Sequence, residues 1–129
     1  MSAITSSTLT ILSIDDSIVM QQLIKQTLSE EYRVLLCDSA IQALALINQE
    51  PISLVLLDVS MPEMDGLDFC RTVRSIPKFQ HLPIVMVTGR DSNLDKLQGR
   101  LAGATEYLTK PFDTEQLKEI LRRLTATLA

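Results

Sequence analysis

The sequence predicts an α/β domain in which helices cover both faces of a doubly wound, five-stranded parallel sheet. Two observations predict this fold. Five short runs rich in Ile, Leu and Val alternate with segments of helical periodicity, and these runs lie at 9–14, 33–37, 52–57, 83–87 and 105–108. Each intervening helix leaves room for a right-handed crossover, so the strands should run parallel. The third and fourth runs are almost continuously apolar, as strands buried on both faces are.

The first and last helical segments have apolar stripes that should face the sheet. The stripe of the first segment consists of Met20, Leu23, Ile24, Thr27 and Leu28. The second segment opens with Ser39 and Gln42, an S-x-x-Q capping box, and the last segment begins at Asp113.

We expect residues 1–8 to be an N-terminal extension and residues 9–128 to form a single domain. We expect the chain to stop with the fifth helix and to leave no room for an output domain.

Composition and charge exclude several classes of function. Of the 129 residues, 46% are hydrophobic and only 4% aromatic, so the core should be aliphatic. A net charge of −4 gives no electrostatic basis for direct nucleic-acid binding. No apolar run approaches the length of a membrane span, and the N-terminus has no signal-peptide pattern, so we expect no membrane insertion and a cytoplasmic location. Cys37 and Cys70 should be small buried hydrophobes, and His81 a surface loop residue.

Polar side chains follow four of the five apolar runs, where the strands should end. They are Asp15 and Asp16, Asp58, Thr88 and Lys110. Because the carboxyl ends of parallel strands meet at one edge of a sheet, these side chains should share a site. Three carboxylates brought together repel one another, which raises the pKa of at least one and favours a divalent cation. Their oxygens suit Mg²⁺, and an activated carboxylate can attack a phosphoryl group.

Each of these residues taken alone has an ordinary structural explanation. Asp16 could be the N-cap of the first helix, and Pro62 and Gly66 could be turn residues. Thr88 and Lys110 could be solvated loop residues. Their joint placement at successive strand ends favours phosphoryl-transfer chemistry instead.

The whole chain resembles the receiver domain of two-component response regulators, and specifically a single-domain, chemotaxis-like regulator. The pattern consists of Asp15-Asp16, Asp58 followed by MPEMDG at 61–66, Thr88-Gly89, Tyr107 and Lys110-Pro111-Phe112. The tail is also similar to regulators of twitching motility and phototaxis. This resemblance implies a flavodoxin-like fold with strand order 2-1-3-4-5 and a cis Lys110–Pro111 bond.

The resemblance also implies roles for individual residues. Asp58 would be the phosphoacceptor, and Asp16, Asp58 and the backbone carbonyl of Ser60 would bind Mg²⁺, with Asp15 acting mainly through water. Lys110 would pair with Asp58 and then with the phosphoryl oxygens. Thr88 would turn its hydroxyl onto the phosphoryl group, and Tyr107 would turn inward to fill the vacated space. Ser60 and Arg90 occupy positions that influence how fast the phosphoryl group is lost.

The function expected from these residues is a phosphorylation-activated switch rather than an enzyme with an external substrate. A histidine kinase or histidine phosphotransfer protein would donate the phosphoryl group, and the protein would catalyse only its own phosphorylation and dephosphorylation. A downstream target protein would dock on the face formed by the fourth helix, fifth strand and fifth helix. Ile18 lies opposite the buried stripe of the first helix, so it should be exposed and contact the donor.

Three other functions share parts of this pattern. A phosphatase with an aspartyl nucleophile usually carries a second acid two residues later, where this chain has Ser60. A flavin carrier needs a phosphate-binding loop after the first strand, and Asp15-Asp16 would repel the phosphate there. A receiver-like scaffold that binds partners without phosphorylation stays open as the alternative.

Overall fold

The fold was established with a computed structural model, in which the described residues are 8–61 and 64–126. The predicted N-terminal extension, apart from Thr8, lies outside these ranges. So do Pro62 and the last two residues of the predicted domain.

Five strands form one parallel sheet in the order β2-β1-β3-β4-β5, which confirms the predicted topology. The strands are β1 (Thr10–Ile14), β2 (Arg33–Cys37), β3 (Leu54–Leu57), β4 (Ile84–Thr88) and β5 (Glu106–Thr109). The third run was predicted to begin at 52, but β3 begins two residues later. Because β1 leads to β2 on one side and pairs with β3 on the other, the strand order reverses at β1, where such folds form their ligand crevice.

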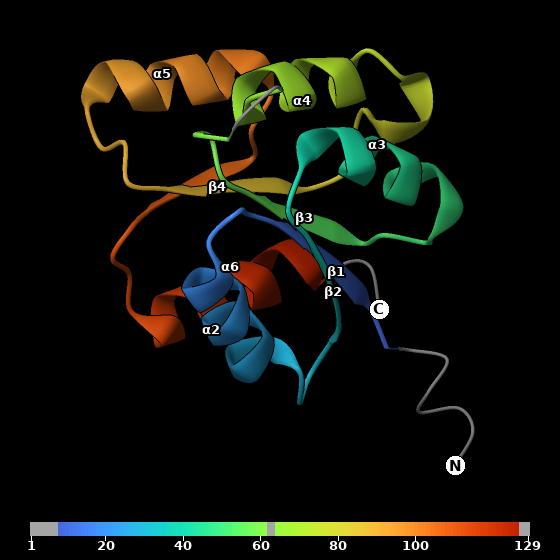
Figure 1. Cartoon of the computed structure of the whole chain (residues 1–129), viewed down its shortest axis with the longest axis vertical. Helices are drawn as coiled ribbons and strands as arrows, with labels where there is room; N and C mark the ends of the chain where they lie inside the picture. Colours follow the sequence, from blue (N-terminus) through green and yellow to red (C-terminus); the bar gives the residue numbers. More distant parts are fainter. Residues whose placement is uncertain (1–7, 62–63, 127–129) are drawn as a thin grey trace.

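Helices cover both faces of the sheet, as predicted (Figure 1). On one face lie α3 (Ala40–Gln49), α4 (Gly66–Arg74) and α5 (Asn93–Ala102). On the other face lie α2 (Ile18–Leu28) and α6 (Thr114–Thr125). A short 3₁₀ helix, η1 (Pro77–Phe79), precedes β4. Among the described residues, no helix is long and apolar enough to cross a membrane.

Side-chain caps set the first turn of several helices. Ser17 caps α2 by accepting a hydrogen bond from the backbone N–H of Met20, so the interpretation of Asp16 as the N-cap is wrong. Ser39 caps α3 as predicted, accepting from the backbone N–H of Gln42. With Ser17 in the capping position, the fold does not use the Asp16 carboxylate to cap α2.

Two mainly aliphatic cores lie on the two faces of the sheet. The core under α3, α4 and α5 contains Phe69 and Met86, and the core under α2 and α6 contains Ile24 and Leu117. The predicted stripe of α2 faces this second core, with Ile24 and Leu28 buried and its other members half-buried. Cys37 and Cys70 are buried free thiols and His81 is exposed, as predicted.

Candidate functional site

The strand register aligns the predicted site residues at one edge of the sheet. Ile14 of β1 pairs with Leu57 of β3, so Asp15 and Asp58 leave the sheet side by side. Thr88 of β4 pairs with Thr109 of β5, and Lys110 follows directly. The backbone N–H of Lys110 donates to the carbonyl of Thr88 at 2.8 Å, which extends this alignment by one residue. The residues that follow the strands therefore lie at one edge of the sheet, as predicted.

Three carboxylates form the centre of the site. One oxygen from each of Asp15, Asp16 and Asp58 lies within 4.8 Å of the others. Asp15 and Asp58 are buried, at 4% and 7% exposure, whereas Asp16 is exposed. Mg²⁺ prefers one or two protein carboxylates and keeps part of its water shell. A cluster of hard oxygen ligands with one side open to solvent fits that preference.

Lys110 lies between two of these carboxylates. Its Nζ atom is 2.7 Å from Oδ2 of Asp15 and 3.8 Å from Oδ2 of Asp58. The predicted pair with Asp58 is therefore present, but Asp15 is the closer partner. Asp15 is also held by the backbone N–H of Ser17, which donates to its Oδ1 at 2.9 Å. Asp58 Oδ2 thus lies near the ammonium group of Lys110, but at 3.8 Å the two do not form a close hydrogen bond.

The pKa of Asp58 lies above its ordinary value. Burial is the largest cause, and Lys110 partly offsets it, while the charges of Asp15 and Asp16 raise the pKa further. The sequence predicted a raised pKa from mutual repulsion, but desolvation contributes more. The backbone N–H of Ser60 donates to Asp58 Oδ1 at 3.3 Å and helps to orient the carboxylate. Ionised Asp58 is therefore a costly group that a cation would stabilise.

The predicted switch residues lie around Arg90, which connects several of them. Thr88 is buried, and its Oγ1 accepts from the backbone N–H of Arg90 at 3.4 Å. The hydroxyl of Tyr107 donates to the carbonyl of Arg90 at 2.7 Å. The Nε of Arg90 donates to Oγ of Ser60 at 2.9 Å. Arg90 thus connects the loop after β4 with the loop after β3 and with β5. The sequence pattern did not predict these two contacts.

Gly66 has a larger role than the turn residue that the sequence indicated. It is the first residue of α4, and its N–H donates to the carbonyl of Val59 at 2.9 Å. A Cβ at this position would lie 2.5 Å from the carbonyl oxygen of Asp58 and 2.8 Å from Cα of Val59. Only glycine allows α4 to approach the backbone of Asp58 and Val59 so closely.

Two further residues lie at the edge of the acid cluster. Ile18 is 75% exposed, as predicted, and together with Asp15, Asp16 and Gln21 it borders a groove of about 560 Å³. Gln21 is buried at 8% exposure, and sequence reasoning missed it. No local signal marks a glutamine on the buried side of a helix, because its partners come from strands that only the fold brings together. The cis peptide bond between Lys110 and Pro111 is present as predicted.

Comparisons with known proteins agree with this geometry. Residues 11–122 match the response regulator receiver domain family. Response regulator MprA of Mycobacterium leprae is 37% identical over 115 residues, which cover 88% of this chain and 50% of that protein. Response regulator PleD of Caulobacter vibrioides is 37% identical over 89% of this chain and 26% of its own length. The chain therefore spans half or less of these curated relatives.

Solved structures of similar length have the same fold. Chemotaxis protein CheY4 of Vibrio cholerae has a TM-score of 0.86 and 34% identity, covering 92% of this chain and 99% of that one. The receiver domain of sensor histidine kinase PA1611 from Pseudomonas aeruginosa has a TM-score of 0.85 and 30% identity, covering 93% and 99%. That structure has a magnesium ion coordinated in its active-site cleft. The family match over most of the chain, the strand order and the clustered acids lead to one conclusion: this protein belongs to the response regulator receiver domain family.

Proposed function

We propose that the protein is a phosphorylation-activated signalling switch that accepts a phosphoryl group on Asp58. The observation that supports this most directly is the meeting of three carboxylates within 4.8 Å beside the ammonium group of Lys110. The donor would be a histidine kinase or a histidine phosphotransfer protein in the cytoplasm. The likeness to a chemotaxis protein makes motility the process we propose.

The chemistry assigns one task to each group. An Oδ atom of Asp58 attacks phosphorus, the bond from phosphorus to the donor imidazole nitrogen breaks, and its electron pair leaves with the nitrogen. Asp15, Asp16, Asp58 and the backbone carbonyl of Ser60 would hold Mg²⁺, which when bound neutralises charge on the transferred oxygens. Lys110, already 3.8 Å from Asp58, would bind one of these oxygens. The same groups would support slow hydrolysis of the acyl phosphate.

Mass spectrometry after incubation with acetyl phosphate tests this proposal. We expect one phosphoryl group on Asp58, labile to hydroxylamine, that forms only when Mg²⁺ is present, because three carboxylates otherwise repel the donor oxygens. Modification of a Ser, Thr or His residue instead would contradict the mechanism. Normal regulation of a partner by a variant that lacks the Asp58 carboxylate would favour the alternative, a scaffold that works without phosphorylation.

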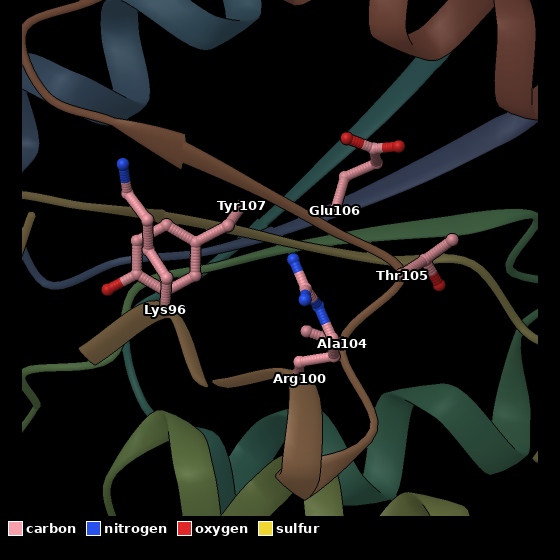
Figure 2. Close-up of a pocket in the computed structure, with 6 residues that line it drawn as sticks. All are labelled: Lys96, Arg100, Ala104, Thr105, Glu106 and Tyr107. Atoms are coloured by element: carbon pink, nitrogen blue, oxygen red, sulfur yellow. The ribbon is translucent and has the colours of Figure 1, made fainter. Parts of the chain in front are cut away.

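The face formed by α5, β5 and α6 is the proposed docking surface for the target. Three leucines of α5, at i, i+3 and i+7 spacing, are exposed: Leu94 at 63%, Leu97 at 48% and Leu101 at 77%. Beside them, Lys96 and Arg100 line a pocket of about 250 Å³ that Tyr107 closes on the β5 side (Figure 2). A movement of Tyr107 would therefore reshape the surface next to this apolar stripe.

Thr88→Ala should separate phosphorylation from the response of this face. The variant keeps Asp58 and the acid cluster, so it should still bind beryllofluoride, a mimic of the phosphoryl group. It lacks the hydroxyl that would bind this group, so most of the amide NMR shifts in α5, β5 and α6 should be lost. Thr72→Ala on α4 is the control. Undiminished shifts across the face in the Thr88 variant would show that Thr88 is not the link.

Ile18→Ala should slow phosphotransfer from the protein donor by about tenfold, the effect of losing ~1.4 kcal/mol of docking energy. Ile18 is exposed on the rim of the acid cluster, where a donor helix must lie to bring its phosphohistidine in line with Asp58. Ile41 is also an exposed isoleucine but lies on α3, so Ile41→Ala is the matched control. Phosphorylation by acetyl phosphate should be unchanged in both. Equal losses with both donors would mean that the substitution disturbs the acid pair.

A further inference from the structure

Gln21 forms three hydrogen bonds in the second core. Its Oε1 accepts from Oγ of Ser13 at 2.6 Å, and its Nε2 donates to the carbonyl of Ser13 at 3.1 Å and to that of Cys37 at 3.0 Å. Both amide protons and the amide oxygen are therefore used. The side chain ties the first turns of α2 to the carboxyl ends of both β1 and β2.

The carbonyl of Cys37 links this set of bonds to the acid cluster. The same oxygen that accepts from Gln21 also accepts from the backbone N–H of Asp15, at 3.0 Å. β1 ends at Ile14 and β2 at Cys37, so these two bonds lie where the chain leaves the sheet and becomes the acid pair. Gln21 and the backbone N–H of Asp15 thus share the Cys37 carbonyl as acceptor, whereas Lys110 and Ser17 hold the Asp15 carboxylate.

The acid cluster needs such a restraint. Asp15, Asp16 and Asp58 repel one another, and repulsion favours a backbone shift that separates them. Mg²⁺ requires near-ideal octahedral geometry, so a small change in the separation of its ligands lowers affinity. An apolar residue at position 21 would fill the same space but would release the end of β2 from α2.

We propose that Gln21 is a positioning residue that holds the acid pair against β2 and thereby sets the affinity of the site for Mg²⁺. This inference rests on the proposed function, in which the cluster holds magnesium. Ser13 is the partner that fixes the orientation of the Gln21 amide, because its hydroxyl donates to Oε1 and so directs Nε2 toward the two carbonyls.

The test is a titration of ¹⁵N-labelled protein with MgCl₂, followed by amide chemical shifts, together with thermal unfolding of each variant. Gln21→Leu should raise the dissociation constant for Mg²⁺ about fivefold to tenfold. Thr125→Val is the control for a general loss of stability, because Thr125 is also buried and donates from its hydroxyl to the carbonyl of Leu121 at 2.7 Å. Its affinity for Mg²⁺ should equal that of the wild type.

A double variant, Ser13→Ala with Gln21→Leu, separates positioning from stability. Gln21→Leu alone leaves the Ser13 hydroxyl without its partner, and the double variant removes this hydroxyl as well. The double variant should therefore melt at a higher temperature than Gln21→Leu. The affinity for Mg²⁺ should stay weak, because the tie to Cys37 is still missing. Recovery of affinity together with stability would overturn the proposal, as would wild-type affinity in Gln21→Leu or equal weakening in Thr125→Val.

The wild-type protein distinguishes this inference from the proposed function. If the wild type shows no Mg²⁺-dependent shifts and no phosphorylation by acetyl phosphate, the proposed function fails and the role of Gln21 fails with it. If the wild type responds to both reagents and Gln21→Leu binds Mg²⁺ equally well, only the role of Gln21 is overturned.

Discussion

Asp58→Asn should abolish phosphorylation by acetyl phosphate and at the same time stabilise the metal-free protein. The amide has no nucleophilic oxygen anion, so no acyl phosphate can form. The stabilisation follows from the raised pKa of Asp58, which burial causes first and the neighbouring carboxylates increase. Wherever the wild-type carboxylate is ionised, the folded protein bears the free-energy cost of keeping that charge buried. Removing its charge should raise the melting temperature by about 4 °C or more, the shift that ~1 kcal/mol produces.

The stability difference between Asp58→Asn and the wild type should change with pH in one direction. The pKa of Asp58 is higher in the folded protein than its ordinary value of 3.8 in the unfolded chain. Between these two values the folded state binds more protons, so wild-type stability falls as pH rises through this window. The advantage of Asp58→Asn should therefore be full above the folded-state pKa and should vanish as pH falls toward the ordinary value.

Thermal unfolding in the presence of a chelator, measured across this pH range, checks the prediction. Asp91→Asn, which removes an exposed carboxylate, is the control and should change the melting temperature little at any pH. An Asp58→Asn protein that melts below the wild type near pH 7 would show that contacts of the carboxylate outweigh its desolvation cost. Residual phosphorylation of the variant would show that another residue accepts the phosphoryl group.

Gly66→Ala should both destabilise the fold and impair phosphorylation, although position 66 carries no chemical group. The new Cβ would lie 2.5 Å from the carbonyl oxygen of Asp58 and 2.8 Å from Cα of Val59. Both are backbone atoms, so α4 or the end of β3 must shift. Overpacking of this kind costs about 1–3 kcal/mol. The shift moves Asp58, the proposed nucleophile, relative to Lys110 and the other acids, and we expect phosphorylation about tenfold slower or more.

Gly89→Ala is a matched control for this substitution. Gly89 follows Thr88 at the same edge of the sheet, and a Cβ there would have no heavy atom within 4 Å among the described residues. It should therefore leave both the unfolding free energy and the phosphorylation rate close to wild type. Urea unfolding and initial rates with acetyl phosphate measure the two effects. If both alanine variants behaved alike, close packing of α4 against Asp58 would not matter for the site.

Much of this fold and site could be predicted because both depend on local patterns. Continuous apolar runs alternating with amphipathic segments indicate a parallel sheet, since only buried strands and covering helices satisfy that pattern. In such a sheet the residues that follow the strands must meet at one edge. Asp15, Asp58, Thr88 and Lys110 were therefore expected together before any distance was known, and the strand register confirms their adjacency.

Contacts between segments that are distant in the chain were decided by the tertiary structure alone. Lys110 lies closer to Asp15 than to Asp58, at 2.7 Å against 3.8 Å. Gly66 and Gln21 carry no chemical signal in the sequence, because their importance comes from backbone atoms of other elements. Composition and periodicity determine which elements form and what chemistry their ends carry. The packing of segments distant in the chain then decides which polar groups touch, because side-chain contacts change over distances shorter than any sequence pattern specifies.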